Sequence, residues 1–368
     1  MKNSSIVYGI IGILLLMPSA HAKQVSTSGE ADTVVVRHQW NSQAHVEAPG
    51  LHVVDEDWIE NVRLGTLQLP QCTGALVSAD GLAVTSAACM RSLETWIRPT
   101  DSAFVADELL QEHRLAGLVV EQLVEVRKLE SPEVPPSDAL PGTRAEIVAA
   151  DDSSSFWEYI WHIYDDVRLV LIPPVEVANF GNEDGVYPRY ALDFALFRVY
   201  DESGQPLDTE SYFAWSDRPP DHREKLFATA VDENGPFTSV TLSDTFTYNG
   251  TVSPPYTTLY GMLDLHHSFG ATGVWGLPAG WITGIKESDL SAALNFSVAG
   301  RCAQIGTGIV DVDMEILGIA FDHAYTGGRE RCVAVSTSGI LSLLRTVFKA
   351  ENIVEELAEQ ALSVEENG

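Results

Sequence analysis

The strongest constraint on the fold lies in residues 72–89, where two short apolar segments flank the pair Asp80-Gly81. The segments, residues 74–77 and 83–85, have the length of strands, and Asp-Gly is typical of the tight turn in a β-hairpin. The pattern therefore predicts two adjacent antiparallel strands. Because further apolar or alternating segments follow along the chain, the sequence indicates a mainly β fold; they lie at residues 67–69, 117–126, 159–172 and 190–200.

The first residues have the pattern of a secretory signal peptide. One lysine precedes an apolar run over residues 6–17, and an Ala-His-Ala sequence ending at Ala22 supplies the small residues of a cleavage site. We expect residues 1–22 to be removed and the protein to be exported. Residues 23–50 are polar and are interpreted as a mobile lead segment. No later stretch is long and apolar enough to predict a membrane span.

The charge of the chain excludes several classes of partner. With 52 acidic and 22 basic residues, the formal net charge is -30. Such a chain repels nucleic acid and anionic lipid, and it has no basic stripe that could bind them. Hydrophobic residues make up 45% of the sequence, which suffices for a core in one large domain or two small barrels.

The four cysteines, Cys72, Cys89, Cys302 and Cys332, indicate two disulfide bonds in an exported protein. Four cysteines allow three pairings, and the sequence alone does not choose among them. No C-x-x-C or H-E-x-x-H pattern occurs, so no zinc site is predicted.

The acidic segment at residues 311–315 is a candidate for calcium binding. It would place Asp311, Asp313 and Glu315 on one face of a strand, but it lacks the glycine of a calcium loop. We interpret it as a solvated strand face. No metal and no cofactor are predicted.

Two segments have helical character. Residues 103–113 are expected to form a short helix. The tail over residues 338–362 is predicted to be an amphipathic C-terminal helix, because its apolar residues recur at helical spacing. The histidine pair His266-His267 is assigned to a surface loop.

Several blocks between residues 65 and 362 occur in a characteristic order. They are Cys72-Thr73-Gly74 with Ser78-Ala79-Asp80-Gly81-Leu82, Tyr187-Pro188-Arg189, Asp193-Phe194-Ala195-Leu196-Phe197-Arg198-Val199-Tyr200, Leu259-Tyr260-Gly261-Met262, Leu277-Pro278 with Trp281, Asn295-Phe296, and Gly318-Ile319-Ala320-Phe321-Asp322. In this order the blocks resemble serine peptidase family 46, the bacterial dipeptidyl peptidase 7 and 11 group.

The resemblance implies a chymotrypsin-like double β-barrel over residues 51–368. The first barrel would span about 51–200, and the second barrel with the C-terminal helix about 201–362. It also implies two disulfide pairs, Cys72 with Cys89 and Cys302 with Cys332. Relatives carry a large helical domain between the catalytic aspartate and serine, and the short link near residues 245–259 takes its place in this chain.

For the catalytic residues, the resemblance assigns Asp193 to the triad aspartate. Ala88 stands where the family has its catalytic histidine, and alanine has no atom that can take a proton. Ile305 stands at the serine position in one register of the loop, whereas Thr307 stands there in the other. A threonine nucleophile would still need a base, such as a displaced histidine.

For the peptide N-terminus, the family uses an asparagine, a tryptophan and an aspartate. The aspartate corresponds to Asp322, while Asp184 and Gly185 stand at the other two positions. The carboxylates of Asp184 and Asp322 are a candidate pair for an amine or a metal ion. We prefer the interpretation of two solvated loop carboxylates, because isolated carboxylates are usually exposed.

These features lead to three hypotheses. The first is an exported, family-46-like protein of the periplasm or exterior of a Gram-negative bacterium, catalytically inactive, that binds peptides or an active peptidase relative. The second is an active serine-type dipeptidyl aminopeptidase with a rearranged nucleophile and base. The third is a structural surface or periplasmic module, in which the fold serves only as a stable building unit. A homodimer is a family expectation only.

Overall fold

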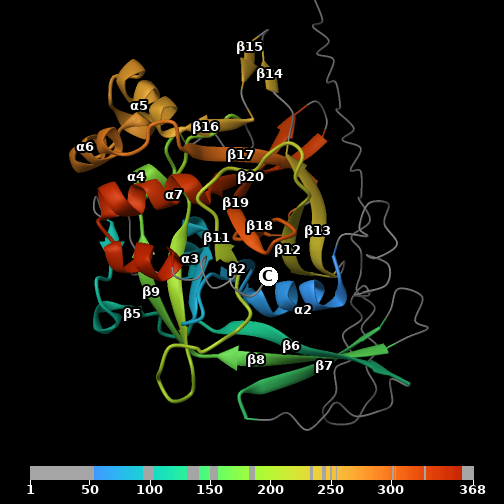
Figure 1. Ribbon diagram of the computed structural model, residues 1–368. Helices are drawn as coiled ribbons and strands as arrows, with labels where there is room; N and C mark the ends of the chain where they lie inside the picture. The colour runs from blue at the N-terminus through green and yellow to red at the C-terminus, as the bar shows by residue number, and fades with distance from the viewer. Residues whose placement is uncertain are drawn as a thin grey trace, which may run out of the picture.

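The computed structural model describes residues 54–358, apart from residues 94–102, 131–140, 150–155, 182–186, 233–234, 243–245, 249–250, 254, 301, 303 and 327–328. The expected signal peptide and the lead segment at residues 23–50 lie outside the described residues. Within the described part of the chain, no helix is both long and apolar enough to cross a membrane. The protein is mainly β, as predicted (Figure 1).

The first sheet contains the strands from the N-terminal half of the chain. Its order is β4-β9-β10-β3-β2-β1-β6-β8-β7, and β5 pairs with β9 at one side. The predicted hairpin is confirmed, because β2 and β3 are antiparallel neighbours joined across Asp80-Gly81. The strands are β1 Thr66–Leu69, β2 Cys72–Leu76, β3 Leu82–Thr85, β4 Phe104–Val105, β5 His113–Arg114, β6 Val120–Leu129, β7 Thr143–Ala149, β8 Phe156–Tyr164, β9 Asp166–Ile172 and β10 Ala195–Tyr200.

The second sheet contains strands from the C-terminal half, in the order β11-β19-β18-β12-β13-β17-β16. Strand β20 pairs with both β17 and β19, so the pairings run from β19 through β18, β12, β13, β17 and β20 back to β19. The strands are β11 Ala214–Trp215, β12 Leu226–Asp232, β13 Gly235–Leu242, β16 Tyr256–Thr258, β17 Ala293–Ala299, β18 Gly308–Val310, β19 Glu315–Thr326 and β20 Arg329–Ser336; β14 Phe246–Tyr248 and β15 Thr251–Ser253 form a separate hairpin.

Short helices cap and connect the sheets. The α-helices are α2 Glu56–Gly65, α3 Ala87–Leu93, α4 Val175–Ala178, α5 Leu259–Ser268, α6 Ala279–Glu287 and α7 Thr337–Leu343, with 3₁₀ turns η1 Leu109–Gln111 and η2 Gly273–Trp275 and a π-helical turn η3 Leu344–Phe348. Where the sequence predicted one helix over residues 338–362, the described tail contains α7, η3 and a further helical segment at residues 351–358. Lys349, with a φ of 54°, separates the last two.

The helix expected at residues 103–113 is not formed, and that prediction was wrong. The segment contains β4, the turn η1 and β5, and both strands pair with β9. Leu109 and Leu110 are exposed, with 46% and 93% of their surface accessible. Because strand pairing satisfies the backbone at each end of the segment, tertiary structure overrides the local helical preference.

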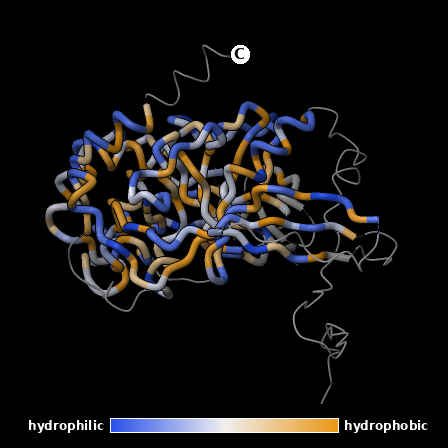
Figure 2. Tube along the Cα trace, turned by 90° about the horizontal axis from the view of Figure 1, so that it is seen from below, coloured by the Kyte–Doolittle hydropathy of each residue, from blue (hydrophilic) through white to orange (hydrophobic). Residues whose placement is uncertain are grey.

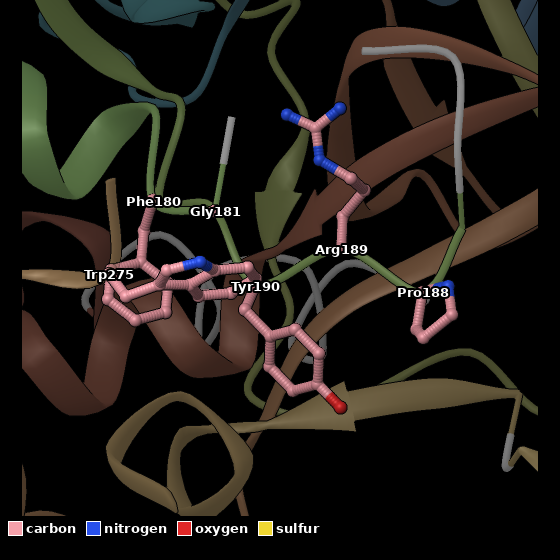
Figure 3. A pocket seen from close by; sticks show the side chains of 6 residues that line it. All are labelled: Phe180, Gly181, Pro188, Arg189, Tyr190 and Trp275. Atoms are coloured by element: carbon pink, nitrogen blue, oxygen red, sulfur yellow. The ribbon is translucent and has the colours of Figure 1, made fainter. Parts of the chain in front are cut away.

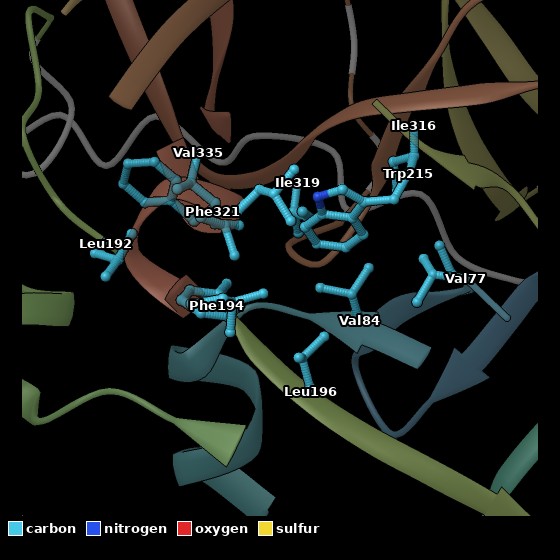
Figure 4. Close-up of a cluster of buried hydrophobic side chains, with 14 of the residues drawn as sticks. Val77, Val84, Leu192, Phe194, Leu196, Trp215, Ile316, Ile319, Phe321 and Val335 are labelled. Atoms are coloured by element: carbon cyan, nitrogen blue, oxygen red, sulfur yellow. The ribbon is translucent and has the colours of Figure 1, made fainter. Parts of the chain in front are cut away.

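One hydrophobic core joins the two sheets (Figure 4). Val84 and Leu196 project from the first sheet, while Ile316, Ile319 and Val335 project from the second, and all five are fully buried. In Figure 2 the hydrophobic stretches run through the body of the described chain. This shared core holds the ends of β3 and β10 against the loop before β18, which is where the candidate site lies.

Candidate functional site

Asp193 lies just before β10 and is almost completely buried, with 4% of its surface exposed. Its Oδ1 atom accepts a hydrogen bond from the Ser86 hydroxyl at 2.9 Å and another from the backbone N–H of Ala88 at 3.0 Å. The structure therefore brings Asp193 to the first turn of α3, beside the position that the resemblance assigns to the catalytic histidine. Among the described residues, no histidine donates a hydrogen bond to this carboxylate.

The local sequence explains why α3 begins at this point. The Ser86 hydroxyl accepts hydrogen bonds from the N–H groups of Ala88, at 3.1 Å, and Cys89, at 3.3 Å. A serine at this position satisfies backbone donors that the first helical turn leaves free. The Ser86 hydroxyl thus has two roles: it caps the start of α3, and it donates a hydrogen bond to Asp193.

Burial raises the pKa of Asp193 above its ordinary value, whereas the donors at Ala88 and Ser86 and the positive charge of Arg91 lower it. The donors compensate for the lost hydration of the carboxylate. Ala88 itself is exposed, and its methyl group can neither accept a proton nor be oriented by Asp193.

The loop before β18 forms backbone hydrogen bonds to a strand of each sheet. The carbonyl of Ile305 accepts a hydrogen bond from the N–H of Thr73 in β2 at 3.0 Å, and the N–H of Gly306 donates to Ala320 in β19 at 2.7 Å. Gly306 has a φ of +84°, and a Cβ atom there would lie 2.0 Å from the Thr73 carbonyl oxygen. Only glycine fits this close approach.

Both candidate nucleophile positions face protein. The half-buried Ile305 side chain packs against the apolar cluster of the first sheet. Thr307 is fully buried; its hydroxyl donates to the Gln304 carbonyl at 2.7 Å and lies 3.2 Å from the Thr73 hydroxyl. A carbonyl and a second hydroxyl cannot act as the base that a threonine nucleophile needs.

Asp322, in β19, forms an ion pair with Arg189 instead of presenting a free carboxylate. Its second oxygen accepts the N–H of His323 at 2.7 Å. The guanidinium therefore compensates much of the charge that an ammonium group would need. The other two predicted positions, Asp184 and Gly185, lie outside the described residues.

A small pocket lies beside Arg189 (Figure 3). Its volume is about 20 Å³, enough for about one water molecule. It is lined by Phe180, Gly181, Pro188, Arg189, Tyr190 and Trp275.

The histidine pair lies in a helix, so its assignment to a surface loop was wrong. Both residues belong to the last turn of α5, and His266 is only 4% exposed. Its Nδ1 atom lies 3.0 Å from the Trp275 carbonyl oxygen and 3.1 Å from the Leu277 nitrogen. These contacts hold the following loop against the helix. Leu259, Met262, Leu263 and His266 are buried at helical spacing, and this pattern in the sequence predicts the helix.

The acidic segment at residues 311–315 forms a turn between β18 and β19, so its prediction as a strand face was wrong. The Asp311 carboxylate accepts the N–H groups of Asp313 and Glu315, and Arg218 pairs with Asp311 and Glu315 at 3.0 and 3.1 Å. Within the described part of the chain, no group of three acidic, histidine or cysteine side chains is arranged to hold a metal ion.

The disulfide pairing that the resemblance implied is confirmed. Cys72 bonds to Cys89, and Cys302 bonds to Cys332, with Cα atoms 6.2 and 6.0 Å apart. The first bond joins β2 to α3 at Cys89, the residue after Ala88. The second ties the segment before the Ile305 loop to β20.

Sequence reasoning missed two partners. Ser86 precedes a short helix, and a serine at such a boundary is a recognised sequence signal for a helix cap. Arg189 carries no local signal for its role, because its partner Asp322 is 133 positions away.

The comparisons with known proteins agree on one family. The family model described as Peptidase S46 matches residues 133–230 and 242–359, which is more than half of the chain. An Asp/Glu-specific dipeptidyl-peptidase of Porphyromonas endodontalis is 26% identical over 174 residues, covering 37% of this chain and 24% of the relative. A dipeptidyl-peptidase 7 of Phocaeicola vulgatus is 25% identical over the same length and shares. The chain thus spans about a quarter of the length of the curated relatives it matches.

The fold has a counterpart among solved structures. The crystal structure of Porphyromonas endodontalis DPP11 in complex with the dipeptide Arg-Glu superimposes with a TM-score of 0.66 at 10% sequence identity. The match covers 81% of this chain and 94% of that chain. At this identity, the likeness concerns the fold.

Proposed function

The chain belongs to the peptidase family 46, and from this premise we propose that it is a dipeptidyl-peptidase-like protein without catalytic activity, which binds peptides or an active relative. The observation that carries the proposal is the environment of Asp193. Ser86 and the N–H of Ala88 supply the hydrogen bonds of its Oδ1 atom, at the place where a triad would need an imidazole. Loss of a triad base typically costs a factor of about 10⁴ to 10⁶ in rate.

The loop geometry supports the same proposal. An isoleucine side chain cannot attack a carbonyl, and Thr307 is buried with its hydroxyl committed to the Gln304 carbonyl. The ion pair between Asp322 and Arg189 is also relevant, because it weakens the attraction for a peptide α-ammonium group. The two altered positions of the triad, at Ala88 and in the loop of Ile305 and Thr307, both favour loss of turnover.

We further propose that the two sheets correspond to the two barrels of a chymotrypsin-like fold, with the first barrel at about residues 51–200 and the second, with the C-terminal helical segments, at about 201–362. The circuit of pairings from β19 back to β19 supports the second barrel. Export after removal of residues 1–22 is part of the proposal. Two disulfide bonds are compatible with an oxidising compartment outside the cytoplasm.

A structural module is the second candidate function. The packing of Ile305 against the apolar cluster of the first sheet favours it, because a side chain occupies space that a substrate cleft would leave open. A binding role and a structural role differ in one measurable respect, since only the first predicts saturable association with a peptide or protein.

The proposed loss of catalysis is tested by fluorophosphonate labelling of the oxidised, mature protein. An active dipeptidyl-peptidase 7, labelled in parallel, is the positive control, and the Thr307→Ala and Asp193→Ala variants are the negative controls. We expect no label on the protein. Label that disappears in either variant would reveal a working hydroxyl nucleophile and support the active alternative.

A further inference from the structure

A group of exposed apolar side chains lies on α5, at its C-terminal end and on η2. Tyr260, Phe269 and Val274 expose 60%, 54% and 48% of their surface. Together they are called the α5–η2 surface below. Helices α5 and α6 lie at one corner of the molecule, beyond the edge strand β16 of the second sheet (Figure 1).

The α5–η2 surface is supported from beneath by an aromatic stack. The Phe269 ring stacks on Trp275 with centroids 4.6 Å apart and an interplanar angle of 16°. The Phe180 ring contacts the same Trp275 ring system edge-on, with centroids 5.5 Å apart. The N–H of Gly181 donates to the Val274 carbonyl at 2.9 Å. Because these contacts tie η2 to the segment after α4, the exposed side chains are held in place before any partner arrives, which lowers the entropic cost of binding.

The same segment is poor in charge. Between Leu259 and Ile285, the only residue among Asp, Glu, Lys and Arg is Asp264, although these residues make up 20% of the whole chain. Asp264 lies near enough to Tyr190, beside the pocket, to help raise the pKa of that phenol, after burial as the main cause. Aromatic enrichment with few charges is the composition of the core of protein interfaces, and the outer surface of a highly charged protein normally lacks it.

We propose that the α5–η2 surface docks an apolar segment of a partner protein that carries basic residues beside it. The apolar side chains would pack on Phe269 and Val274, and the basic residues would meet Asp264 and the field of a chain with a formal charge of -30. A second copy of this chain is a poorer occupant, because it brings the same negative charge. The inference rests on the proposed binding role and assigns that role to a surface outside the altered catalytic site.

The test uses the full oxidised chain and a synthetic helical peptide with leucine and tryptophan on one face and lysine on the other. The same peptide with glutamate in place of lysine is the charge control. Binding is measured by titration calorimetry for the unchanged protein, the Phe269→Ser/Val274→Ser variant and the Leu109→Ser/Leu110→Ser variant. The last pair removes two exposed leucines from η1, at a different site. Urea unfolding checks that each variant is folded, and Tyr260→Ser serves as a milder variant of the same surface.

We expect the lysine peptide to bind, and the Phe269→Ser/Val274→Ser variant to weaken it by about tenfold or more, as for truncation of central interface residues. The Leu109→Ser/Leu110→Ser variant should bind as the unchanged protein does. Equal effects of both variants, no effect of either, or equal binding of the glutamate peptide would overturn the proposal. Sedimentation as a dimer that Phe269→Ser/Val274→Ser dissociates would overturn it in favour of a second copy. An absence of binding together with an absence of turnover would refute the surface and leave the loss of catalysis intact.

Discussion

Asp193 is a buried carboxylate, and a buried carboxylate needs hydrogen-bond donors. In a working triad the imidazole would be one of these donors; in this chain the hydroxyl of Ser86 and the N–H of Ala88 donate to the Oδ1 atom. Retention of Asp193 is therefore explained by structure alone, because the residue fixes the start of α3 to the strand β10. A retained aspartate is not by itself a sign of retained catalysis.

Replacement of Ser86 by alanine should destabilise the protein by about 1–3 kcal/mol, because it removes a donor to the buried Asp193 and the cap of α3. Urea unfolding of the Ser86→Ala variant measures the change. The control is Ser92→Ala in the same helix, whose exposed hydroxyl donates to the Cys89 carbonyl. Equal stability of Ser86→Ala and the unchanged protein would contradict the structural role of this contact.

Asp311 gives a prediction about pH. Burial raises the pKa of its carboxyl to about 6, and the neighbouring carboxylates of Glu315 and Asp313 act in the same direction. The folded state therefore binds this proton more tightly than the unfolded state, so Asp311 favours folding at low pH and loses that contribution as pH rises from about 4 to 6.

Asp311→Asn keeps an acceptor for the turn but removes the titration. Urea unfolding at several pH values should show that the variant gains stability relative to the unchanged protein as pH rises from about 4 to 7. A difference that stays constant over this range would show that Asp311 titrates normally.

Among the elements, the last helical segment, residues 351–358, is fixed to the first sheet by a buried charge cluster. Arg198 of β10 donates to both oxygens of Glu356 at 2.8 Å and to Glu112 at 2.8 Å, while Tyr200 donates to Glu112 at 2.7 Å. Ser78 also donates to Glu356, at 2.6 Å. The C-terminal segment thus closes over strands from the first half of the chain.

Glu356→Gln should destabilise the protein by about 2–3 kcal/mol, because it removes one of the two carboxylates that compensate the buried Arg198. Glu355→Gln is a matched control, since Glu355 is the preceding residue of the same segment and is exposed. Urea unfolding measures the loss of global stability, and hydrogen exchange measures local opening of residues 351–358. The cluster would have no special role if both variants behaved alike.

Elements differ in how well the sequence predicts them. The hairpin of β2 and β3 is encoded locally by two apolar segments around Asp80-Gly81, so it is predictable. Residues 103–113 are not, because their conformation depends on pairing with β9. At the site, the assignment of Ala88 and Ile305 to the catalytic positions comes from the family resemblance. The pairing of Arg189 with Asp322 is not, because it depends on how distant strands meet.

At the scale of the whole molecule, the chain keeps the fold of its family, and the proposal is that the groups that would perform peptide cleavage are altered. One core joins the sheets, and each disulfide bond lies next to one half of the site. These contacts hold the fold together without any contribution from a catalytic histidine or serine. This separation of fold from chemistry is what the proposed loss of catalysis requires.

The measurement that tests the central claim most directly is release of dipeptides from a broad pool of peptides by the oxidised, mature protein, followed by mass spectrometry. An active dipeptidyl-peptidase 7 provides the comparison under the same conditions. The account predicts that the peptide pool stays intact while the protein remains folded. Release of dipeptides that Asp193→Ala or Thr307→Ala abolishes would contradict it, because it would mean that this chain still assembles a nucleophile and a base.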